Sequence, residues 1–442
     1  MKMELKLDEW WKIALYGMEH TDANLFLTWK AGTGKSTLLR TFIAHTQKKV
    51  VVLAPTGVAA LNAKGQTIHS FFKFSPKTTL QKIKARAKYL IGDPTYTELD
   101  SIVIDEISMV RADLFDYMDQ FLRIVRGNNL PFGGVQMILI GDLFQLPPVV
   151  TRDEEEILKM NGYESPYFFS SKVMGKKKFK LFYHELEKIY RQTDEYFIDF
   201  LNKIREGEVN ETMLQSFNQK VKETKVNLEP WDIYLAGKNA IVNQINQEKL
   251  DELETQERTY FATIKGAISE SSYPTEAELT LKIGAQVMFV ANDPAERRVN
   301  GTLGLVLKLE EEKIRVQIFG GDTVEVIPYN RKVSQYYYDD TKNKFETETV
   351  GSFNQVPLKL AWACTIHKSQ GKTFDKVILD FTGGIFAHGQ TYVALSRCKT
   401  LEGISMTRPL QMRDFIFDKQ VLDFIQQAKQ QTLTNTYFNS DC

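Results

Sequence analysis

The stretch from Trp29 to Ser36, WKAGTGKS, constrains this chain more than any other. Every position except the first fits the phosphate-loop pattern G-x-x-x-x-G-K-[ST]. In such a loop, backbone N–H groups surround a phosphate, the lysine (Lys35) reaches the outer phosphates, and the hydroxyl (Ser36) ligates Mg²⁺. Apolar residues on either side predict a buried strand before the loop and a helix after it, whose N-terminus faces the phosphates. The stretch therefore predicts a nucleotide site in an α/β domain, against the alternative of a glycine-rich turn with a surface lysine.

Trp29 stands where the pattern requires its first glycine. Glycine adopts backbone angles that a residue with a Cβ resists, so we expect Trp29 to strain or redirect the mouth of the loop and to weaken nucleotide binding. No glutamine precedes the loop, which leaves the residue that reads adenine unassigned. The expected nucleotide contacts are Ala31, Gly32, Thr33, Gly34, Lys35, Ser36 and Thr37.

Length and composition set wider limits. A chain of 442 residues exceeds what one core usually serves, so two to four domains are expected. Lys plus Arg and Asp plus Glu both number 56, so local basic patches would have to hold any nucleic acid. Three widely separated cysteines suit a reducing compartment. With no long apolar run and no signal sequence, we expect a cytoplasmic protein without a membrane partner, associated with the nucleoid if the source is bacterial.

Two segments downstream of the loop predict contacts with nucleic acid. The apolar run 50–54 reads as a buried strand ending in Pro-Thr-Gly, which places donors at the carboxyl edge of a parallel sheet. Residues 67–72, TIHSFF, combine hydroxyls and an imidazole that suit phosphates with aromatic rings that suit bases. The alternative for residues 67–72 is a core segment with a solvent-facing histidine. The candidate contacts are Pro55, Thr56, Gly57, His69, Ser70, Phe71 and Phe72.

Residues 73–99 look like an insertion between these segments and the next strand. Four basic residues recur at every second position: Lys82, Lys84, Arg86 and Lys88. An extended segment would align all four on one face, whereas a helix would scatter them. A basic wedge against a DNA backbone and an ordinary solvated face both stay open.

Two later strands carry the remaining groups for phosphate chemistry. The hydrophobic run 101–104 ends in Asp105, suited to holding Mg²⁺, and Glu106, suited to activating the water that attacks the outermost phosphate. A third strand, 135–140, is followed by Gln145, whose amide can donate to that phosphate and accept from the water. Together with Lys35, these residues predict hydrolysis of a nucleoside triphosphate.

The ordered motifs WKAGTGKS, APTGVAA, DEISM and GDLFQLPPV resemble the first motor domain of the Pif family of DNA helicases, in superfamily 1, group B. Residues 114–136, including NLPFGGVQ, resemble the signature that separates Pif-type enzymes from RecD-like relatives; the alternative is a linker helix with a Pro/Gly turn. The resemblance covers nearly the whole chain, apart from Trp29, the missing glutamine and a variable β region. It implies ATP and Mg²⁺ as cofactors.

The resemblance also implies a domain plan of the α/β class. A first RecA-like parallel-sheet motor domain would comprise residues 1–72 and 100–180, with 73–99 as an inserted wedge. A second would comprise 181–292 and 356–442. Residues 293–355 would form an inserted Src-homology-3-like β-barrel, which short period-two strands and tight glycine turns also indicate.

Several roles in the second motor domain are carried over from the family's motifs. Arg191 and Arg397 would reach the γ-phosphate, a class of residue worth ~10³–10⁵ in turnover. Gln370 and Gly371 would contact the nucleotide or couple it to DNA. The DNA contacts would be Asn239, Thr365, His367 and Lys368. The alternatives are surface or salt-bridged arginines and helix-surface asparagines.

These assignments predict a motor in which ATP closes the cleft between two domains and hydrolysis opens it, moving the protein along one DNA strand. The resemblance implies 5′-to-3′ movement. Expected partners are single-stranded DNA and its junctions with duplex, with forks and G-quadruplexes as further candidates, bound by a monomer or a weak DNA-induced dimer. The alternatives are a RecD-like helicase, a nucleic-acid-stimulated phosphate-loop ATPase that does not unwind, and a small-molecule kinase.

Overall fold

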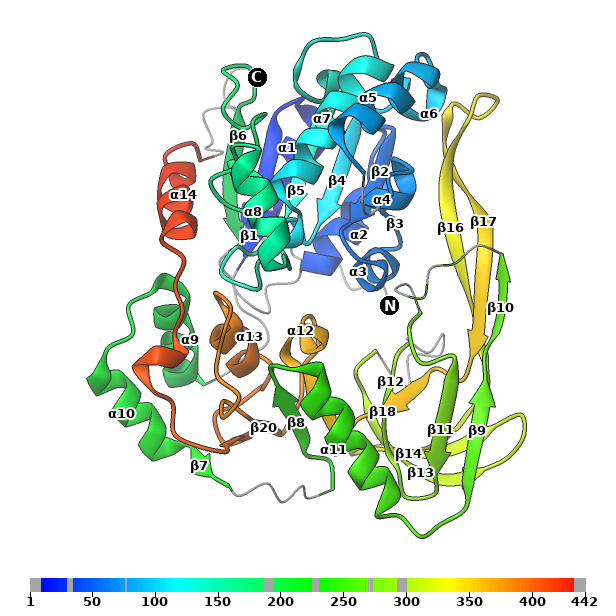
Figure 1. Cartoon of the computed structure of the whole chain (residues 1–442), viewed down its shortest axis with the longest axis vertical. Helices are drawn as coiled ribbons and strands as arrows, with labels where there is room; N and C mark the ends of the chain where they lie inside the picture. Colours follow the sequence, from blue (N-terminus) through cyan, green and yellow to red (C-terminus); the bar gives the residue numbers. More distant parts are fainter. Residues whose placement is uncertain are drawn as a thin grey trace. The chain divides into compact units, whose positions relative to one another are not determined.

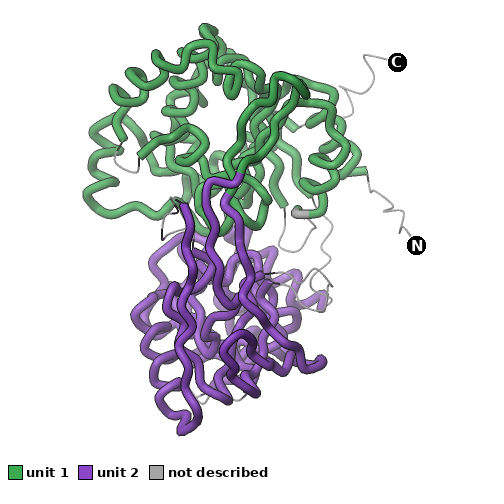
Figure 2. The backbone as a smooth tube through the Cα atoms, turned by 90° about the vertical axis from the view of Figure 1, so that its right-hand side faces the viewer, with its two compact units in different colours: residues 1–191, 334–348, 418–442 green, residues 192–333, 349–417 purple. Residues whose placement is uncertain are grey.

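The computed structural model describes residues 9–29, 35–75, 78–186, 194–224, 230–266, 268, 270, 273–291 and 300–432. The chain divides into two compact units (Figure 2): unit 1 contains residues 1–191, 334–348 and 418–442, and unit 2 contains residues 192–333 and 349–417. Each unit has its own parallel sheet, which confirms the predicted α/β class with two parallel-sheet domains. Among the described residues, no helix has the length and apolarity needed to cross a bilayer.

The sheet of unit 1 has six parallel strands in the order β3-β2-β4-β5-β1-β6 (Figure 1). Their bounds are β1 Asn24–Trp29, β2 Val50–Ala54, β3 Gln66–Thr67, β4 Ser101–Asp105, β5 Gln136–Ile140 and β6 Leu181–Leu186. The residues of β4 and β5 are buried throughout, as expected for parallel strands covered on both faces. We had assigned β6 to the second domain, which is wrong, because β6 pairs with β1 along its whole length.

The helices of unit 1 are α1 Glu9–His20, α2 Lys35–His45, α3 Gly57–Asn62, α4 Ile68–Phe71, α5 Leu80–Tyr89, α6 Pro94–Thr97, α7 Ala112–Val125, α8 Arg152–Met160 and α14 Lys419–Lys429. From α14, Val421 and Ile425 enter the core of unit 1, and Phe424 stacks on Phe169 with ring centroids 4.5 Å apart. Placing all of 356–442 in the second domain was therefore wrong: residues after 417 belong to unit 1.

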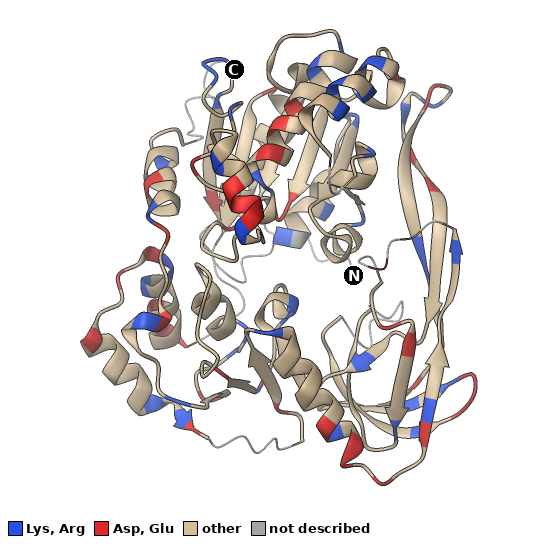
Figure 3. Cartoon of the chain, viewed as in Figure 1, with Lys and Arg blue, Asp and Glu red and all other residues tan. Residues whose placement is uncertain are grey.

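Residues 73–99 contain helices rather than an extended basic segment. In α5, Ile83 and Ala87 are four residues apart and both are buried in the core of unit 1. The four alternating basic residues are all exposed. Figure 3 colours the Lys and Arg positions of the chain blue, including those along this helix. The extended form is thus wrong, since the apolar pair fixes a helix and scatters the charges. A wedge function for this segment stays a prediction.

The segment NLPFGGVQ is not a linker but forms an ordered turn that packs against α7. Phe132 is fully buried with φ 51°, and its backbone N–H donates to Asp119 Oδ1 at 2.8 Å. Gly133 has φ +63°, and a Cβ there would lie 2.8 Å from the Leu122 carbonyl oxygen. Only glycine fits both the left-handed angle and this close approach.

Unit 2 contains a five-stranded parallel sheet in the order β19-β8-β20-β21-β7. Its strands are β7 Lys222–Glu223, β8 Ile233–Ala236, β19 Ala363–Thr365, β20 Val377–Leu379 and β21 Ile404–Met406. Its helices are α9 Glu195–Glu206, α10 Glu211–Lys220, α11 Asn239–Asp251, α12 Ile366–Ser369 and α13 Gln390–Leu395.

The predicted antiparallel β region is present but extends beyond its expected bounds. A five-stranded sheet in the order β15-β14-β13-β12-β18 runs from Gln286 to Leu360 rather than from 293 to 355. Its strands are β12 Gln286–Phe289, β13 Leu303–Leu309, β14 Ile314–Ile318, β15 Thr323–Val326 and β18 Leu358–Leu360. Smaller sheets are formed by β9 Glu257–Phe261, β10 Thr263–Gly266, β11 Glu278–Lys282, β16 Tyr329–Asp339 and β17 Lys344–Gln355. Closure into a barrel stays a prediction.

The tip of the β16–β17 hairpin, residues 334–348, belongs to unit 1. The backbone N–H of Tyr336 donates to Gln66 Oε1 at 3.0 Å. Lys49 Nζ donates to the Tyr338 hydroxyl at 2.9 Å and pairs with Glu98 at 2.6 Å. This part of the predicted barrel is therefore integral to the first unit.

Candidate functional site

The carboxyl ends of β1 and β4 bring the predicted phosphate-binding lysine next to the predicted carboxylates. Lys35 is the first residue of α2, and its Nζ lies 2.9 Å from Asp105 Oδ1 at the end of β4. The same ammonium donates to Glu106 Oε1. All three side chains are mostly buried. The structure thus joins residues that are far apart in the chain and that were proposed separately for phosphate, metal and water.

The charges of this cluster shift one another's titration. Burial alone would lower the pKa of the Lys35 ammonium, but attraction to Asp105 and Glu106 outweighs it and raises the pKa above its ordinary value. Burial raises the pKa of Glu106, with repulsion from Asp105 adding to the effect and Lys35 opposing it. Lys35 therefore stays protonated at neutral pH, and the Glu106 carboxylate binds a proton more readily than an exposed glutamate does.

Glu106 also has an uncommon backbone conformation. Its φ of 56° and ψ of 46° are left-handed, and its N–H donates to Asp105 Oδ1 at 3.0 Å. A residue with a Cβ in this region costs of order 1 kcal/mol or more and persists where the surroundings fix it. The strain is located at the residue predicted to activate water.

A second buried pair follows β5. Gln145 Nε2 donates to Asp142 Oδ2 at 3.1 Å, and the Phe144 N–H donates to Asp142 Oδ1 at 3.1 Å. Asp142 is 1% exposed, and its charge helps to raise the pKa of Glu106, which places it beside the carboxylates. We predicted Gln145 but missed Asp142. Its position two residues after the buried strand β5, comparable to that of Asp105 at the end of β4, was the available signal.

Trp29 does not strain the chain in the way we expected. It is the last residue of β1, pairs in register with Leu186 and is 5% exposed. Its φ is not among the positive values of the described residues. The predicted backbone strain is therefore wrong at this position, because the strand continues through it. Instead the indole faces Lys35, whose Nζ lies 4.8 Å from the ring centroid.

The loop itself gives no further test. Ala31, Gly32, Thr33 and Gly34 lie outside the described residues, as does the side chain of Ser36. Thr37 lies in α2 as predicted.

Unit 1 presents its predicted DNA contacts on two short helices that begin at threonines. Thr56 follows β2, and its Oγ1 accepts the Ala59 N–H at 3.2 Å to cap α3. Thr67 caps α4 in the same way, with Oγ1 accepting the Ser70 N–H at 3.2 Å. A hydroxyl that accepts as a cap keeps its own proton for a phosphate oxygen. His69 is half-buried, and burial lowers its pKa, assisted by Arg111.

The expectation that Phe71 and Phe72 stack on bases is wrong. Their exposures are 2% and 0%, and both rings belong to an aromatic cluster with Tyr96 and Phe121. Burying such rings contributes about 1.5–3 kcal/mol each to folding, so they form the core that supports the turn. Pro55 and Gly57 flank Thr56 at the sheet edge, as predicted.

Unit 2 repeats this arrangement at the end of β19. Thr365 Oγ1 accepts the Lys368 N–H at 3.1 Å and caps α12. His367 is half-buried with a pKa lowered by burial, and Lys368 is exposed. Asn239, the first residue of α11, is exposed. Its neighbour on the helix, Asn246, has a structural role, exchanging two hydrogen bonds with the Ala363 backbone at 2.9 and 3.0 Å.

Among the described residues, the nucleotide contacts predicted in unit 2 do not form a cluster of the kind that surrounds Lys35. Arg397 is 1% exposed, and its guanidinium donates to the carbonyls of Val393, Ser369 and Lys372 and to Ser396 Oγ. Contact with a phosphate would require release of some of these bonds. Gln370 ends α12, and Gly371 follows with φ +79°. Arg191 lies outside the described residues.

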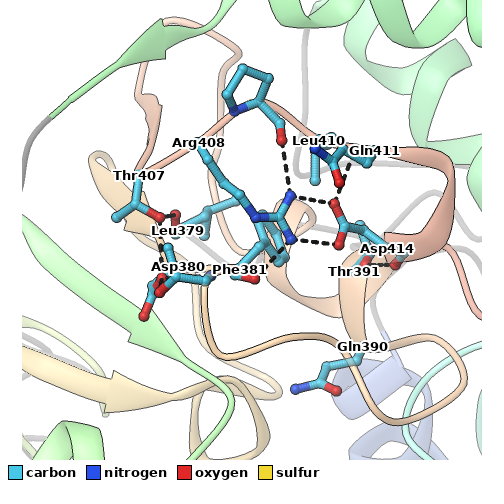
Figure 4. A network of polar contacts seen from close by, with 12 residues as sticks. Leu379, Asp380, Phe381, Gln390, Thr391, Thr407, Arg408, Leu410, Gln411 and Asp414 are labelled. Atoms are coloured by element: carbon cyan, nitrogen blue, oxygen red, sulfur yellow. Dashed lines mark hydrogen bonds and ion pairs between the residues drawn. The ribbon is translucent and has the colours of Figure 1, made fainter.

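A buried ion pair fixes the helix that precedes Arg397 (Figure 4). Arg408 forms a bidentate pair with Asp414 at 2.6 and 2.7 Å and donates to the Phe381 carbonyl at 2.8 Å. The Thr391 hydroxyl, from α13, donates to the Asp414 carbonyl. Such a network orders α13, and with it the backbone that carries Arg397.

Comparison with known proteins identifies the family. A family model described as PIF1-like helicase matches residues 12–215. The ATP-dependent DNA helicase Pif1 of Bdellovibrio bacteriovorus is 32% identical over 415 residues, which cover 91% of this chain and 88% of the relative. The chain belongs to the PIF1-like helicase family. PIF1 of Xenopus laevis is 35% identical over 397 residues, covering 86% of this PIF1-like chain but only 58% of the Xenopus protein.

Solved structures of this family agree with the fold. Pif1 from Bacteroides sp in complex with ADP-AlF4 has 38% identity and a TM-score of 0.85, with 97% of this chain and 98% of that chain covered. Bacteroides Pif1 with ADP-AlF3 and single-stranded DNA has 38% identity and a TM-score of 0.67 at the same coverage. This PIF1-like chain therefore has the RecA-like fold that the motifs predicted.

Proposed function

We propose that this PIF1-like chain is an ATP-dependent DNA helicase, which hydrolyses ATP to move along single-stranded DNA and to unwind duplex. The observation that carries the proposal is the cluster at the end of β4, where Lys35 donates to both Asp105 and Glu106. The family relation supports it, since the solved Bacteroides Pif1 complexes hold nucleotide analogues and single-stranded DNA.

Each residue of the cluster has a role that its position supports. The Lys35 ammonium binds the outer phosphates and neutralises charge that develops during phosphoryl transfer. Glu106 orients the attacking water and takes its proton, a task helped by its raised pKa. Gln145 senses the γ-phosphate through its amide, and Asp142 positions that amide.

The donor set also suits magnesium. Asp105 offers a carboxylate at a strand end, and Mg²⁺ prefers such oxygen ligands together with phosphate oxygens. Asp105 and Ser36 would hold the ion, which when bound would neutralise negative charge on the phosphates. Lys35, which contacts Asp105 in this structure, would then be able to bind the outer phosphates of the nucleotide.

The two threonine-capped turns supply the DNA contacts. Thr56, His69 and Ser70 in unit 1 and Thr365, His367 and Lys368 in unit 2 would donate to successive phosphates of one strand. These contacts carry no base information, which suits a motor that must move along any sequence. Asn239 would add a further contact from α11.

Several finer assignments stay predictions. They include γ-phosphate contacts by Arg191 and Arg397, coupling through Gln370 and Gly371, and 5′-to-3′ movement. They also include preference for junctions, forks or G-quadruplexes, action as a monomer or weak DNA-induced dimer, and a cytoplasmic location.

The test measures hydrolysis first and unwinding second. We expect single-stranded DNA to stimulate ATP hydrolysis, and a 5′-tailed duplex to be displaced faster than a 3′-tailed one; forked and G-quadruplex substrates extend the series. Stimulation without displacement of any substrate would reduce the function to a DNA-stimulated ATPase. Hydrolysis that is indifferent to DNA would overturn the proposal. Faster displacement of the 3′-tailed duplex would refute the direction alone.

A further inference from the structure

The Lys35 ammonium has a partner for each of its donor directions. An ammonium carries three N–H groups. Two of them are directed at Asp105 and Glu106, and the face of the Trp29 indole lies 4.8 Å from the nitrogen. A cation over an indole is attracted by the negative face of the ring, most strongly where water is excluded. Both residues are largely buried here, so this contact belongs to the strong class.

Trp29 is well fixed for this role. The indole packs in one core cluster with Leu38 and Leu39 of α2, the helix that begins with Lys35. Its backbone is held in β1 between β5 and β6. The ring therefore cannot follow the lysine if the ammonium moves away. A glycine, which the phosphate-loop pattern expects here, would offer no such contact.

We propose that Trp29 is a positioning residue that holds Lys35 on its carboxylates in the nucleotide-free chain and thereby lowers the affinity for nucleoside triphosphate. The inference rests on the proposed function, because it requires Lys35 to bind phosphate. With all three donor directions engaged, a phosphate oxygen gains an N–H only when one partner is released. The indole stabilises the resting position, and only a contact that differs between the two states changes affinity.

The expected size follows from the strength of the contact. Over the range from exposed to desolvated sites, a cation–π interaction corresponds to a change of about two- to thirty-fold in the nucleotide dissociation constant. Removing the attraction while keeping the ring should tighten binding by that factor. The effect should be present without DNA, since the contact lies wholly within unit 1.

Fluorinated tryptophans at position 29 give the sharpest experiment, because added fluorine weakens the negative face of the ring with little change of shape. The full chain would carry mono-, di- and trifluorotryptophan at position 29, and the dissociation constant of a fluorescent non-hydrolysable ATP analogue would be measured by anisotropy with Mg²⁺. We expect the constant to fall stepwise with each fluorine. The same series at Trp11, which packs in the same core, should leave it unchanged.

The outcomes separate this inference from the function on which it rests. A dissociation constant that stays flat or rises along the series at position 29 would overturn the role of Trp29 while leaving the ATPase intact. An equal fall at Trp11 would also overturn it, since the effect would then be one of core packing. Failure of every chain, including the unmodified one, to bind the analogue would overturn both. Trp29→Phe and Trp29→Leu provide a second comparison, with tighter binding expected for leucine.

Discussion

The two units contain the same three-residue turn. Unit 1 has Thr67-Ile68-His69 after β3, and unit 2 has Thr365-Ile366-His367 after β19. The threonines have nearly identical backbone angles, φ −72° and ψ 147° against φ −74° and ψ 148°, and each caps a four-residue helix. In both turns the isoleucine is buried and the histidine is half-buried. The chain thus uses one local design twice to present a hydroxyl and an imidazole at a sheet edge.

The residue that follows the histidine makes the difference between the two turns. Ser70 is exposed and accepts the Gln66 side-chain amide at 2.8 Å, whereas Lys368 at the matching position is an exposed cation. Beyond it, unit 1 continues into buried aromatic core, and unit 2 continues into Gln370 and Gly371. The same backbone geometry therefore carries a neutral side chain, Ser70, in unit 1 and a cation, Lys368, in unit 2. In unit 1, a largely buried lysine, Lys35, pairs with two carboxylates at the end of a parallel strand.

The largest expected effect tests whether ATP hydrolysis depends on the lysine–carboxylate cluster of unit 1. Lys35→Ala should lower the turnover of ATP at least ~100-fold, because the ammonium that neutralises the transferring phosphate is gone. Affinity for single-stranded DNA without nucleotide should stay within about twofold, since both turns remain. Steady-state hydrolysis and fluorescence anisotropy measure the two properties, with Lys12→Ala on the surface of α1 as the control. Retained hydrolysis would show that the chemistry does not depend on the cluster in unit 1.

The second effect tests whether the two turns contribute equally to the binding of single-stranded DNA. Thr67→Val and Thr365→Val each remove a cap, worth about 1 kcal/mol of stability, and a hydroxyl that we propose as a donor to a DNA phosphate. A hydrogen bond to a charged group contributes about 1.5–3 kcal/mol, so single-stranded DNA should bind roughly tenfold or more weakly in both variants.

Thr151→Val is the matched control for these two variants. Thr151 caps α8, with Oγ1 accepting the Glu154 N–H at 3.3 Å, and its loss should cost stability without weakening DNA binding. Unequal DNA affinities of Thr67→Val and Thr365→Val, differing by more than about fivefold, would break the comparison between the two turns.

The sequence predicted the residues of the cluster and most of the central strands because their signals are local. Buried apolar runs with polar residues at their ends specify parallel strands and strand-end chemistry together. What failed depended on distant partners. The fate of Phe71 and Phe72 was decided by Tyr96 and Phe121, which become neighbours only in the folded core. β6 reads equally well as the first strand of a second domain until it pairs with β1.

In one other segment, the sequence held the decisive signal, but the pattern of charges obscured it. In residues 80–89, the period-two charges left an extended segment open, yet Ile83 and Ala87 carry the four-residue spacing of a helix face. Burial of two apolar groups fixes the conformation more strongly than solvated charges do. The bonding of the Arg397 guanidinium to backbone carbonyls has no sequence signal, because any residue supplies a carbonyl.

The third effect is an exchange of Ser70 and Lys368, the residues that follow the histidines of the two turns. Lys368→Ser should reduce the slope of log affinity against log salt by about 0.7, the value for one phosphate contact to a single strand. Ser70→Lys should increase the slope by the same amount, and the double variant should restore it. Titrations of single-stranded DNA at four salt concentrations measure the slopes. A double variant that fails to recover the original slope would show that the two turns contact the strand in different ways.

The smallest effect concerns the two imidazoles. Burial lowers the pKa of both His69 and His367, and Arg111 lowers that of His69 further. Because each folded-state pKa lies below the unfolded value of about 6.5, the unfolded chain takes up protons first as pH falls through that value, and stability is lost on acidification. Urea unfolding should therefore show a larger decrease in the free energy of unfolding between pH 7.5 and 5.5 for the unmodified chain than for His69→Gln or His367→Gln, by up to about 1 kcal/mol. His45→Gln, an exposed histidine on α2, serves as the control. A decrease that is as large in His69→Gln or His367→Gln as in the unmodified chain would contradict the contribution of that imidazole.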